Sequence, residues 1–354
     1  MSLHEDEKWM CRCLQLAERG RMGAPPNPMV GAVVVHEGRI LGEGYHRQVG
    51  TAHAEVNAIA AVPDRLRHLL PDSTLYVNLE PCAHHGRTPP CCELITHVGF
   101  KRVVVGMVDP FAEVSGRGIA HIRAAGIMVT TGVLEDQCRA LNRVFITYHA
   151  ERRPYVTLKW AQSADGYLDG VRADSTTPAA QLSNTYTTMH VHHMRAMHDA
   201  ILVGGRTALL DNPRLNTRYW HGTSPLRIVL AGRTTLPHTL QLLSDGQPTL
   251  VYGEAIAHCT PAVAFAAAPN SIAELLADLH VRGIQRLMVE GGARVLQAFL
   301  NTGLWDEAYV EHASMLLGQG VAAPHVPAGT PAEHTTLWGV PVIHYDNTEF
   351  SLQR

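Results

Sequence analysis

The sequence predicts a protein of two α/β domains that are joined near residue 150. Its 354 residues exceed one typical domain and suffice for two separate hydrophobic cores. Short apolar runs alternate with amphipathic stretches along the chain, which is the order of strands and helices in layered α/β domains. A charged segment, Glu151-Arg152-Arg153-Pro154, separates two such series. We therefore predict domains over residues 1–149 and 150–354.

The composition excludes several classes of protein. The chain carries 29 basic and 32 acidic side chains, interspersed and with a net charge of −3, so it lacks the basic stripe of a nucleic-acid-binding surface. It has neither an apolar run of about 18 residues that could span a membrane nor an apolar signal peptide. Its seven cysteines are odd in number and clustered, which is not the pattern of a disulfide framework. We expect a cytoplasmic enzyme that binds neither nucleic acid nor membrane and forms a homo-oligomer, a dimer or a tetramer.

The first domain is predicted to contain a helix, a strand hairpin and then alternating helices and strands. Trp9, Met10 and Cys13 lie on one helical face, and Gly20 ends that helix. A turn at Glu37-Gly38 joins two strands into a hairpin. The predicted elements are helix 5–19, strands 30–35 and 39–45, helix 53–62, strand 74–79, a helix from residue 91, strand 102–107, helix 118–125, strand 127–131 and helix 134–148.

One imidazole, two thiols and one carboxylate form the strongest chemical signal in the chain. His53 and Glu55 stand in the first turn of a predicted helix, Cys82 follows a predicted strand, and Cys91 begins the next helix. A tetrahedral Zn²⁺ with three protein ligands keeps a fourth position for water, whose pKa the metal lowers. Glu55 is then available to carry a proton from that water to a departing amine. The pattern predicts a zinc site of His53, Cys82 and Cys91 with Glu55 as the catalytic residue of a hydrolytic deaminase.

A closed structural zinc site is the alternative to a catalytic one. It requires a fourth protein ligand, and Cys92 is the candidate. Because Cys92 is adjacent to Cys91 on a helix, its side chain is expected to point elsewhere. We interpret Cys92 as a small core residue.

The segment between the two cysteines points to a narrower family. It reads Ala-His-His-Gly-Arg-Thr-Pro-Pro over residues 83–90 and replaces the compact Pro-Cys-x-x-Cys of nucleobase deaminases. With Pro26-Asn27-Pro28 and Gly42-Glu43-Gly44-Tyr45-His46, it resembles the diaminohydroxyphosphoribosylaminopyrimidine deaminases of riboflavin biosynthesis. The resemblance implies a cytidine-deaminase-like three-layer domain. It also implies four residues that contact the ring or phosphoribosyl group of the substrate: Asn27, His46, His84 and Arg87. Arg87 suits a phosphate because its guanidinium binds two oxygens at once.

The second domain shows a similar alternation of strands and helices. The predicted elements are strand 155–161, helix 184–197, strands 200–203, 226–230 and 248–252, helix 272–282, strand 286–290, helix 293–301 and strands 308–312 and 342–353. Paired glycines, Gly204-Gly205 and Gly291-Gly292, follow two of the strands. They either let a phosphate approach backbone N–H groups at a helix N-terminus or simply form tight turns. Neither pair belongs to a G-x-G-x-x-G motif, so a Rossmann domain is not indicated.

Several segments of this domain resemble the reductase half of bifunctional riboflavin enzymes. The segments are Leu158-Lys159-Trp160-Ala161, Asp199-Ala200-Ile201-Leu202-Val203-Gly204, Asp211-Asn212-Pro213-Arg214-Leu215 and Glu290-Gly291-Gly292. The resemblance implies a dihydrofolate-reductase-like fold and reduction of the ribosyl group with NADPH. It places Ala161, Thr207, Asp211 and Gly292 at the cofactor. It places Lys159, Arg195, Leu215, Arg218 and Glu290 at the substrate, with the two arginines near its phosphate.

The second domain also departs from that family. Where members carry Gly-Glu-Ser-x-Trp-Ile-Thr before the long helix, this chain has Ala179-Ala180-Gln181-Leu182-Ser183, which keeps only the hydroxyl of Ser183. Where members carry an acid after Val-Leu or Val-Ile, this chain has Ala231. A deaminase with a lapsed reductase domain is therefore the alternative to a bifunctional enzyme. A nucleic-acid-editing deaminase is the third hypothesis, and the balanced charge argues against it.

Overall fold

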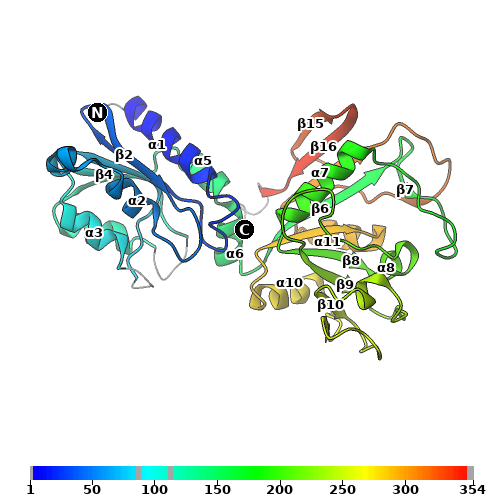
Figure 1. Cartoon of the computed structure of the whole chain (residues 1–354). Helices are drawn as coiled ribbons and strands as arrows, with labels where there is room; N and C mark the ends of the chain where they lie inside the picture. The colour runs from blue at the N-terminus through cyan, green and yellow to red at the C-terminus, as the bar shows by residue number, and fades with distance from the viewer. Residues whose placement is uncertain (1–2, 85–88, 111–114, 349–354) are drawn as a thin grey trace. The chain divides into compact units, whose positions relative to one another are not determined.

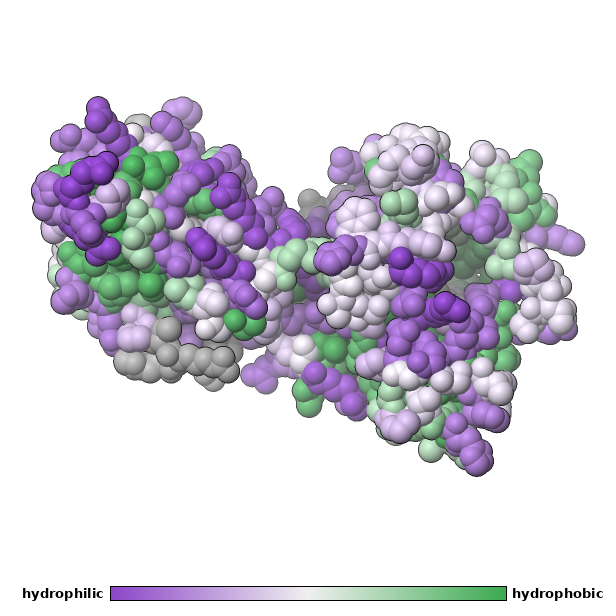
Figure 2. All heavy atoms as spheres, viewed as in Figure 1, coloured by the Kyte–Doolittle hydropathy of each residue, from purple (hydrophilic) through white to green (hydrophobic). Residues whose placement is uncertain are grey.

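The computed structural model describes residues 3–84, 89–110 and 115–348. It divides into two compact units, Met1–Arg152 and Arg153–Arg354. Figure 1 shows each unit as helices packed against a sheet. None of the helices described is long and apolar enough to cross a bilayer. Figure 2 shows mostly hydrophilic and neutral side chains on the visible face, with scattered hydrophobic patches.

The first unit is built on a five-stranded sheet with the order β2-β1-β3-β4-β5. Its strands are β1 (Gly31–His36), β2 (Arg39–Tyr45), β3 (Thr74–Leu79), β4 (Arg102–Met107) and β5 (Met128–Thr131). β1 is antiparallel to β2 and β3, whereas β3, β4 and β5 are parallel. The five predicted strands are confirmed. β1, β3 and β4 are short apolar runs that the sheet buries, whereas the edge strands β2 and β5 are only partly buried.

Helices cover both faces of this sheet and give the predicted three layers. Alternate strand residues feed two separate cores, since successive side chains of a strand point to opposite faces. On one face pack α2 (Ala54–Ala60), α3 (Cys91–Val98) and α4 (Arg117–Ala124); on the other pack α1 (Leu3–Glu18) and α5 (Glu135–Leu141). A 3-10 helix, η1 (Asp64–Asp72), leads into β3.

The predicted helix 134–148 is wrong as a single element. The structure has α5 and then α6 (Arg143–Ala150), with a break at Asn142. The Asn142 side chain accepts from the backbone N–H of Met29 at 2.8 Å and donates to the Met29 carbonyl at 3.0 Å. This tertiary pairing fixes a non-helical residue where the local sequence favours a helix.

The second unit contains a nine-stranded sheet with the order β11-β10-β9-β8-β12-β6-β13-β16-β15. The first seven strands are parallel, and β16 and β15 are antiparallel additions. The strands are β6 (Tyr155–Gln162), β8 (Ala200–Gly204), β9 (Leu226–Leu230), β10 (Thr249–Tyr252), β11 (Val263–Ala266), β12 (Arg286–Gly291), β13 (Glu307–His312), β15 (Ala332–Leu337) and β16 (Val340–Asp346). A separate pair joins β7 (Tyr167–Asp169) to β14 (Val321–Ala322).

The described part of this unit has helices on both faces of the sheet. They are α7 (Thr185–Ala196), α8 (Gly205–Asp211), α9 (Gln241–Ser244), α10 (Ile272–Val281) and α11 (Ala293–Thr302). The larger core lies between the sheet and α10 and α11, and a smaller one lies around α8 and α9. Under α7, Met288 and Tyr309 of the sheet form a small apolar cluster with Val191 and Met194. The other side chains that β6, β12 and β13 place on that face are mostly polar, and this strip is part of the second site.

Sequence patterns missed β11 and β15 and extended β16 too far. Five of the six residues of β15 are exposed, so this edge strand lacks the apolar alternation that marks a strand. The predicted strand 342–353 is instead the second arm of a hairpin that turns at Trp338-Gly339. Its last residues, 349–353, lie outside the described residues.

Candidate functional site

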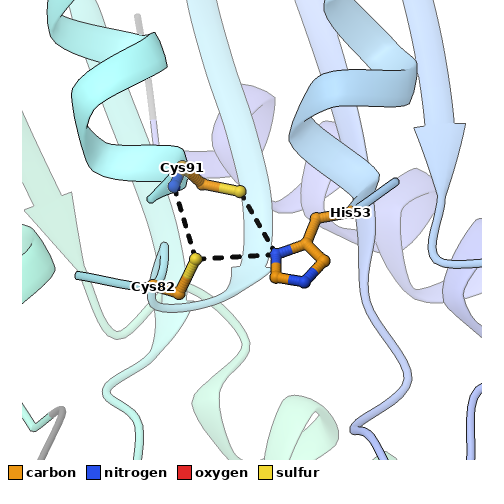
Figure 3. A group of neighbouring side chains, drawn as sticks. All are labelled: His53, Cys82 and Cys91. Carbon is orange, nitrogen blue, oxygen red and sulfur yellow. Dashed lines mark hydrogen bonds between the residues drawn. The ribbon is translucent and has the colours of Figure 1, made fainter. Parts of the chain in front are cut away.

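The three predicted metal ligands come together in the first unit. His53 is the N-cap of α2, Cys82 follows β3, and Cys91 is the first residue of α3. The His53 Nδ1 atom lies 3.5 Å from the Cys82 Sγ and 3.3 Å from the Cys91 Sγ, and all three donor atoms lie within 4.8 Å of one another (Figure 3). Among the residues that the structure describes, this is the one such cluster of metal-binding side chains.

The spacing of these donor atoms fits zinc. With zinc–sulfur bonds of about 2.3 Å and zinc–nitrogen bonds of about 2.0 Å, tetrahedral geometry separates neighbouring donors by about 3.5 Å. The Cys91 thiol, His53 and the backbone N–H of Cys91 at 3.3 Å all stabilise the Cys82 thiolate and lower the pKa of Cys82 well below its usual value. A thiolate is the form of cysteine that binds a metal. The chemistry of the donor set is therefore that of a zinc site with three protein ligands.

Cys92 does not belong to this cluster. Its side chain is 2 % exposed and packs in the hydrophobic core with Ile95 of the same helix. The three-ligand group thus leaves a coordination position that Cys92 does not fill.

Glu55 stands beside the ligand cluster in the first turn of α2. Its side chain is 3 % exposed. Burial and the nearby charge of Cys82 raise the pKa of Glu55 to about 7. A carboxyl group with a pKa near neutrality can both accept and release a proton.

His46 and Asn27 form a polar pair next to the metal ligands. The His46 Nε2 atom lies 3.0 Å from the Asn27 amide nitrogen, its Nδ1 atom lies 3.2 Å from the Ala52 carbonyl, and its ring meets the His53 ring edge-on at 5.5 Å. These contacts fit a neutral imidazole that donates from Nδ1 and accepts at Nε2. Burial lowers the pKa of His46 and so favours that form. His84 is exposed in the loop after Cys82, and Arg87 lies outside the described residues.

Glu80 is a structural residue of this site that sequence reasoning missed. It is 4 % exposed, and its carboxylate accepts backbone N–H groups from Asp109 at 3.2 Å, Gly116 at 2.9 Å, Gly118 at 2.9 Å and Ile119 at 3.2 Å. A Cβ atom at Gly118 would lie 1.9 Å from the Pro81 carbonyl oxygen, so α4 begins in direct contact with the Glu80-Pro81-Cys82 segment. Glu80 thereby fixes the backbone that presents Cys82.

In the second unit, Arg195 of α7 pairs with Glu290 of β12. Its Nε and Nη2 atoms donate to the two carboxylate oxygens at 2.8 and 2.6 Å, and Nη1 donates to the Asn216 carbonyl at 3.2 Å. Burial alone would raise the pKa of Glu290, but the Arg195 guanidinium holds it below its usual value. The two predicted substrate residues therefore form one buried, charge-neutral pair.

The other predicted substrate residues lie in different settings. Lys159 of β6 forms an ion pair with Glu311 of β13, 3.7 Å from Nζ to Oε2. Arg218 is exposed, and its backbone N–H donates to the Nδ1 atom of His192 at 3.1 Å. Leu215 is 3 % exposed and packs its side chain in the core around α8 and α9. The structure thus assembles Lys159, Arg195 and Glu290 on one face of the sheet and directs the Leu215 side chain into the interior.

The predicted cofactor residues gather at the carboxyl ends of neighbouring strands. Ala161 is near the end of β6, Thr207 is in the helix that follows β8, and Gly292 follows β12, and these three strands are adjacent in the sheet. Ligands of open α/β sheets bind at this edge. A Cβ atom at Gly292, where φ is +35°, would lie 2.9 Å from the Thr207 hydroxyl, so the two loops touch.

Asp211 and the first glycine pair have structural partners. Asp211 binds the guanidinium of Arg172, a buried residue that sequence reasoning missed and that also donates to Asp169 at 2.6 Å. A Cβ atom at Gly205 would lie 3.0 Å from the Ala231 carbonyl oxygen. Close packing against Ala231 therefore accounts for this glycine.

Comparison with known proteins gives matches over both units. Residues 3–107 match the cytidine and deoxycytidylate deaminase zinc-binding region, and residues 154–341 match the RibD C-terminal domain. The chain is 38% identical to the riboflavin biosynthesis protein RibD of Aquifex aeolicus, covering 90% of this chain and 89% of that protein. It is 34% identical to RibD of Escherichia coli, covering 89% of each chain. A diaminohydroxyphosphoribosylaminopyrimidine deaminase/5-amino-6-(5-phosphoribosylamino)uracil reductase of Thermotoga maritima superposes with a TM-score of 0.82 at 34% identity, covering 97% of this chain and 99% of that one.

Replacing Glu80 by glutamine is expected to weaken metal binding. The amide NH₂ of the introduced glutamine would face backbone N–H groups, and each unsatisfied donor costs about 1–3 kcal/mol. Because Glu80 fixes the segment that bears Cys82, zinc affinity should fall by roughly 10- to 100-fold, measured by competition with a chromogenic chelator. Glu135→Gln, on the exposed side of α5, is the matched control. Equal affinities for the two variants would contradict this role of Glu80.

Acid is expected to destabilise the second unit through His192. This residue is 1 % exposed, and burial, then Arg195 and Arg218, lower the pKa of His192 from 6.5 to about 4. Below pH 6.5, His192 becomes protonated in the unfolded chain but stays neutral in the folded chain. The free energy of unfolding therefore declines as pH falls towards 4. Urea unfolding of His192→Asn, which keeps an acceptor but does not titrate, should show a smaller decline between pH 7.5 and 5. A variant at the exposed His221 should retain the wild-type decline; the same slope in all three proteins would refute the assignment.

Proposed function

Because the chain belongs to the RibD family of bifunctional riboflavin biosynthesis proteins, we propose roles for the residues of its two sites. The protein acts in riboflavin biosynthesis as a zinc-dependent pyrimidine deaminase and a reductase. The prediction of a bifunctional enzyme is confirmed, and with it the two α/β folds. We also propose that the two domains meet close to the predicted boundary between residues 149 and 150, after the end of α6 at Ala150; the compact units divide at Arg152.

The proposed first reaction is hydrolytic deamination of 2,5-diamino-6-(5-phosphoribosylamino)pyrimidin-4(3H)-one. His53, Cys82 and Cys91 hold the zinc. Zinc supplies a Lewis acid that makes hydroxide available at neutral pH. Glu55 accepts a proton from the attacking water and delivers it to the departing amine, which leaves as ammonia. The observation that carries this role is a buried carboxyl group in the same helical turn as a metal ligand.

Four residues are proposed to hold this substrate. The amide group of Asn27 offers a donor and an acceptor next to the ligand cluster, and its hydrogen bond to the neutral His46 keeps it in place. His84 and Arg87 are proposed to contact the phosphoribosyl group, since they follow Cys82 in the same loop. The product would be 5-amino-6-(5-phosphoribosylamino)uracil.

The proposed second reaction reduces the ribosyl side chain of that product to ribityl. NADPH supplies the hydride when it is bound. Ala161, Thr207 and Gly292 are proposed to line its site, which agrees with their position at the carboxyl ends of three adjacent strands. Asp211 is also proposed to line the NADPH site, where its ion pair with Arg172 holds its carboxylate in place.

The substrate of this second reaction is proposed to meet two kinds of residue. Lys159 and Arg218 bring positive charge to the phosphoribosyl group, and Arg218 is the more exposed of the two. Arg195 and Glu290 are proposed to face the substrate together, because two hydrogen bonds join the Arg195 guanidinium to the Glu290 carboxylate. Leu215 is proposed to contact it through backbone atoms, because its side chain is in the core.

We propose further that the enzyme is cytoplasmic and forms a homo-oligomer, a dimer or a tetramer. All seven cysteines are unpaired, which is usual in a reducing compartment. Tyr186, Trp220 and Trp338 are 58, 45 and 54 % exposed, and aromatic residues of this kind are enriched where protein copies meet.

Glu55→Gln is expected to abolish deamination and spare reduction. Loss of the proton carrier should slow ammonia release from the diamino pyrimidine by at least about 100-fold. Zinc content should stay at the wild-type value, and NADPH-dependent reduction of the already deaminated substrate should be unchanged. A zinc-loaded Glu55→Gln protein that releases ammonia at the wild-type rate would exclude this role.

Arg218→Ala is expected to impair reduction and spare deamination. A charged hydrogen bond to a phosphate contributes about 1.5–3 kcal/mol, so kcat/KM for NADPH oxidation should fall by roughly 10- to 100-fold. Ammonia release is the internal control. Arg282→Ala at the C-cap of α10, whose side chain pairs with Asp278, is the matched control for loss of an arginine. If both variants oxidise NADPH at equal rates, Arg218 does not bind the substrate.

A further inference from the structure

The second unit contains a buried carboxylate for which neither the family resemblance nor the proposed reaction has a role. Glu311 is the fifth residue of β13 and is 3 % exposed. An ionised carboxylate at such depth requires hydrogen bonds and an opposite charge. Each of its two oxygens has such partners, and they come from three separate segments.

The partners of Glu311 are two hydroxyls and one ammonium group. The Thr187 hydroxyl donates to Oε1 at 2.8 Å and the Ser183 hydroxyl donates to Oε2 at 2.8 Å. Lys159 places its Nζ atom 3.7 Å from Oε2. Glu311 therefore joins β6 to the segment that precedes α7 and to the first turn of α7.

Thr187 connects this contact to the beginning of α7. Its hydroxyl oxygen accepts the Asn184 backbone N–H at 3.1 Å, and the Asn184 side chain accepts the Thr187 N–H at 2.9 Å, which is a capping box. The hydroxyl that completes the cap is the one that donates to Glu311. The N-terminus of α7 is consequently anchored to β13 through a charged group.

Charges alternate across the sheet beneath α7. Glu290, Lys159 and Glu311 stand on β12, β6 and β13, which are adjacent in that order, and Arg195 of α7 pairs with Glu290. Lys159 and Glu311 line one cavity with Thr187, His190 and Tyr309. Lys159 thus stands between two carboxylates, and Glu311 is the one within ion-pair distance.

We propose that Glu311 is a positioning residue of the reductase: together with the hydroxyls of Ser183 and Thr187 it holds the Lys159 ammonium in place for the phosphoribosyl substrate. This inference rests on the proposed role of Lys159. Glu311 itself does not touch the substrate; it restrains a flexible four-carbon side chain whose ammonium has three donors. Without that restraint, binding of the substrate must itself order the lysine, at a cost in affinity.

The test is a mutant cycle between Glu311 and Lys159, measured as NADPH oxidation with 5-amino-6-(5-phosphoribosylamino)uracil. Glu311→Gln should raise the KM for this substrate by about tenfold, while the KM for NADPH and kcat change less than about twofold. In a Lys159→Met background the same substitution should change the substrate KM by less than about twofold, because Glu311 acts through Lys159. Glu311→Asp, which keeps the charge, should restore most of the affinity.

Glu307→Gln is the matched control, since Glu307 is also a buried carboxylate on the same face of β13 but binds Thr157 and His344. Glu307→Gln should change the substrate KM by the same factor in the wild-type and Lys159→Met backgrounds. Ammonia release by each variant reports whether the rest of the chain is intact. The proposal would be overturned if Glu311→Gln raised the substrate KM equally in the wild-type and Lys159→Met backgrounds. It would also be overturned if Glu311→Gln raised the KM for NADPH as much as the KM for the substrate. If Lys159→Met raises the KM and Glu311→Gln does not, the positioning role fails and the role of Lys159 stands; if Lys159→Met has no effect, both fail.

Discussion

The convergence of one imidazole and two thiols on a single point constrains the whole first unit. His53, Cys82 and Cys91 come from the start of one helix, the end of a strand and the start of another helix, yet their donor atoms lie within 4.8 Å of one another. Such a cluster tolerates little relative movement of α2, β3 and α3. The buried carboxylate of Glu80 helps to restrict such movement, because four backbone N–H groups around the start of α4 converge on it. Within the described residues, the hydrogen bonds that satisfy that charge come from backbone donors.

In the second unit, charged side chains that are largely out of water are neutralised by ion pairs. Its polar strip under α7 holds charged side chains largely out of water, where an unpaired charge is costly. Arg195 balances Glu290 and Lys159 balances Glu311, and hydroxyls complete the hydrogen bonds of Glu311. Pairing makes the strip neutral as a whole while leaving Lys159 with donors to spare. A polar strip of this kind suits a substrate with phosphate and sugar hydroxyls better than an apolar pocket would.

Sequence patterns predicted the buried strands and the zinc ligands, because both leave local signals: an apolar run in one case and unusual residues at defined spacing in the other. They failed where the deciding contact is remote in sequence. Asn142 breaks a helix because it pairs with the backbone of Met29, 113 residues away. Glu80 was missed because its partners are backbone groups that carry no residue-type signal. Arg172 and Glu311 were missed for a similar reason, since each is identified only by partners such as Asp211 and Ser183.

The two units share one rule about where chemistry can be placed. In both, several residues with proposed roles lie where parallel strands end: Glu80 and Cys82 follow β3, and Ala161 and Gly292 lie at the ends of β6 and β12. Strand ends leave the sheet ladder, so their backbone groups become available for ligands or for buried carboxylates. The loop before α7, which departs from the family pattern, also keeps a contact with the sheet. Ser183, the one hydroxyl that remains of the usual segment before α7, is the one that donates to Glu311, so the substituted loop still connects to the sheet through a charged group.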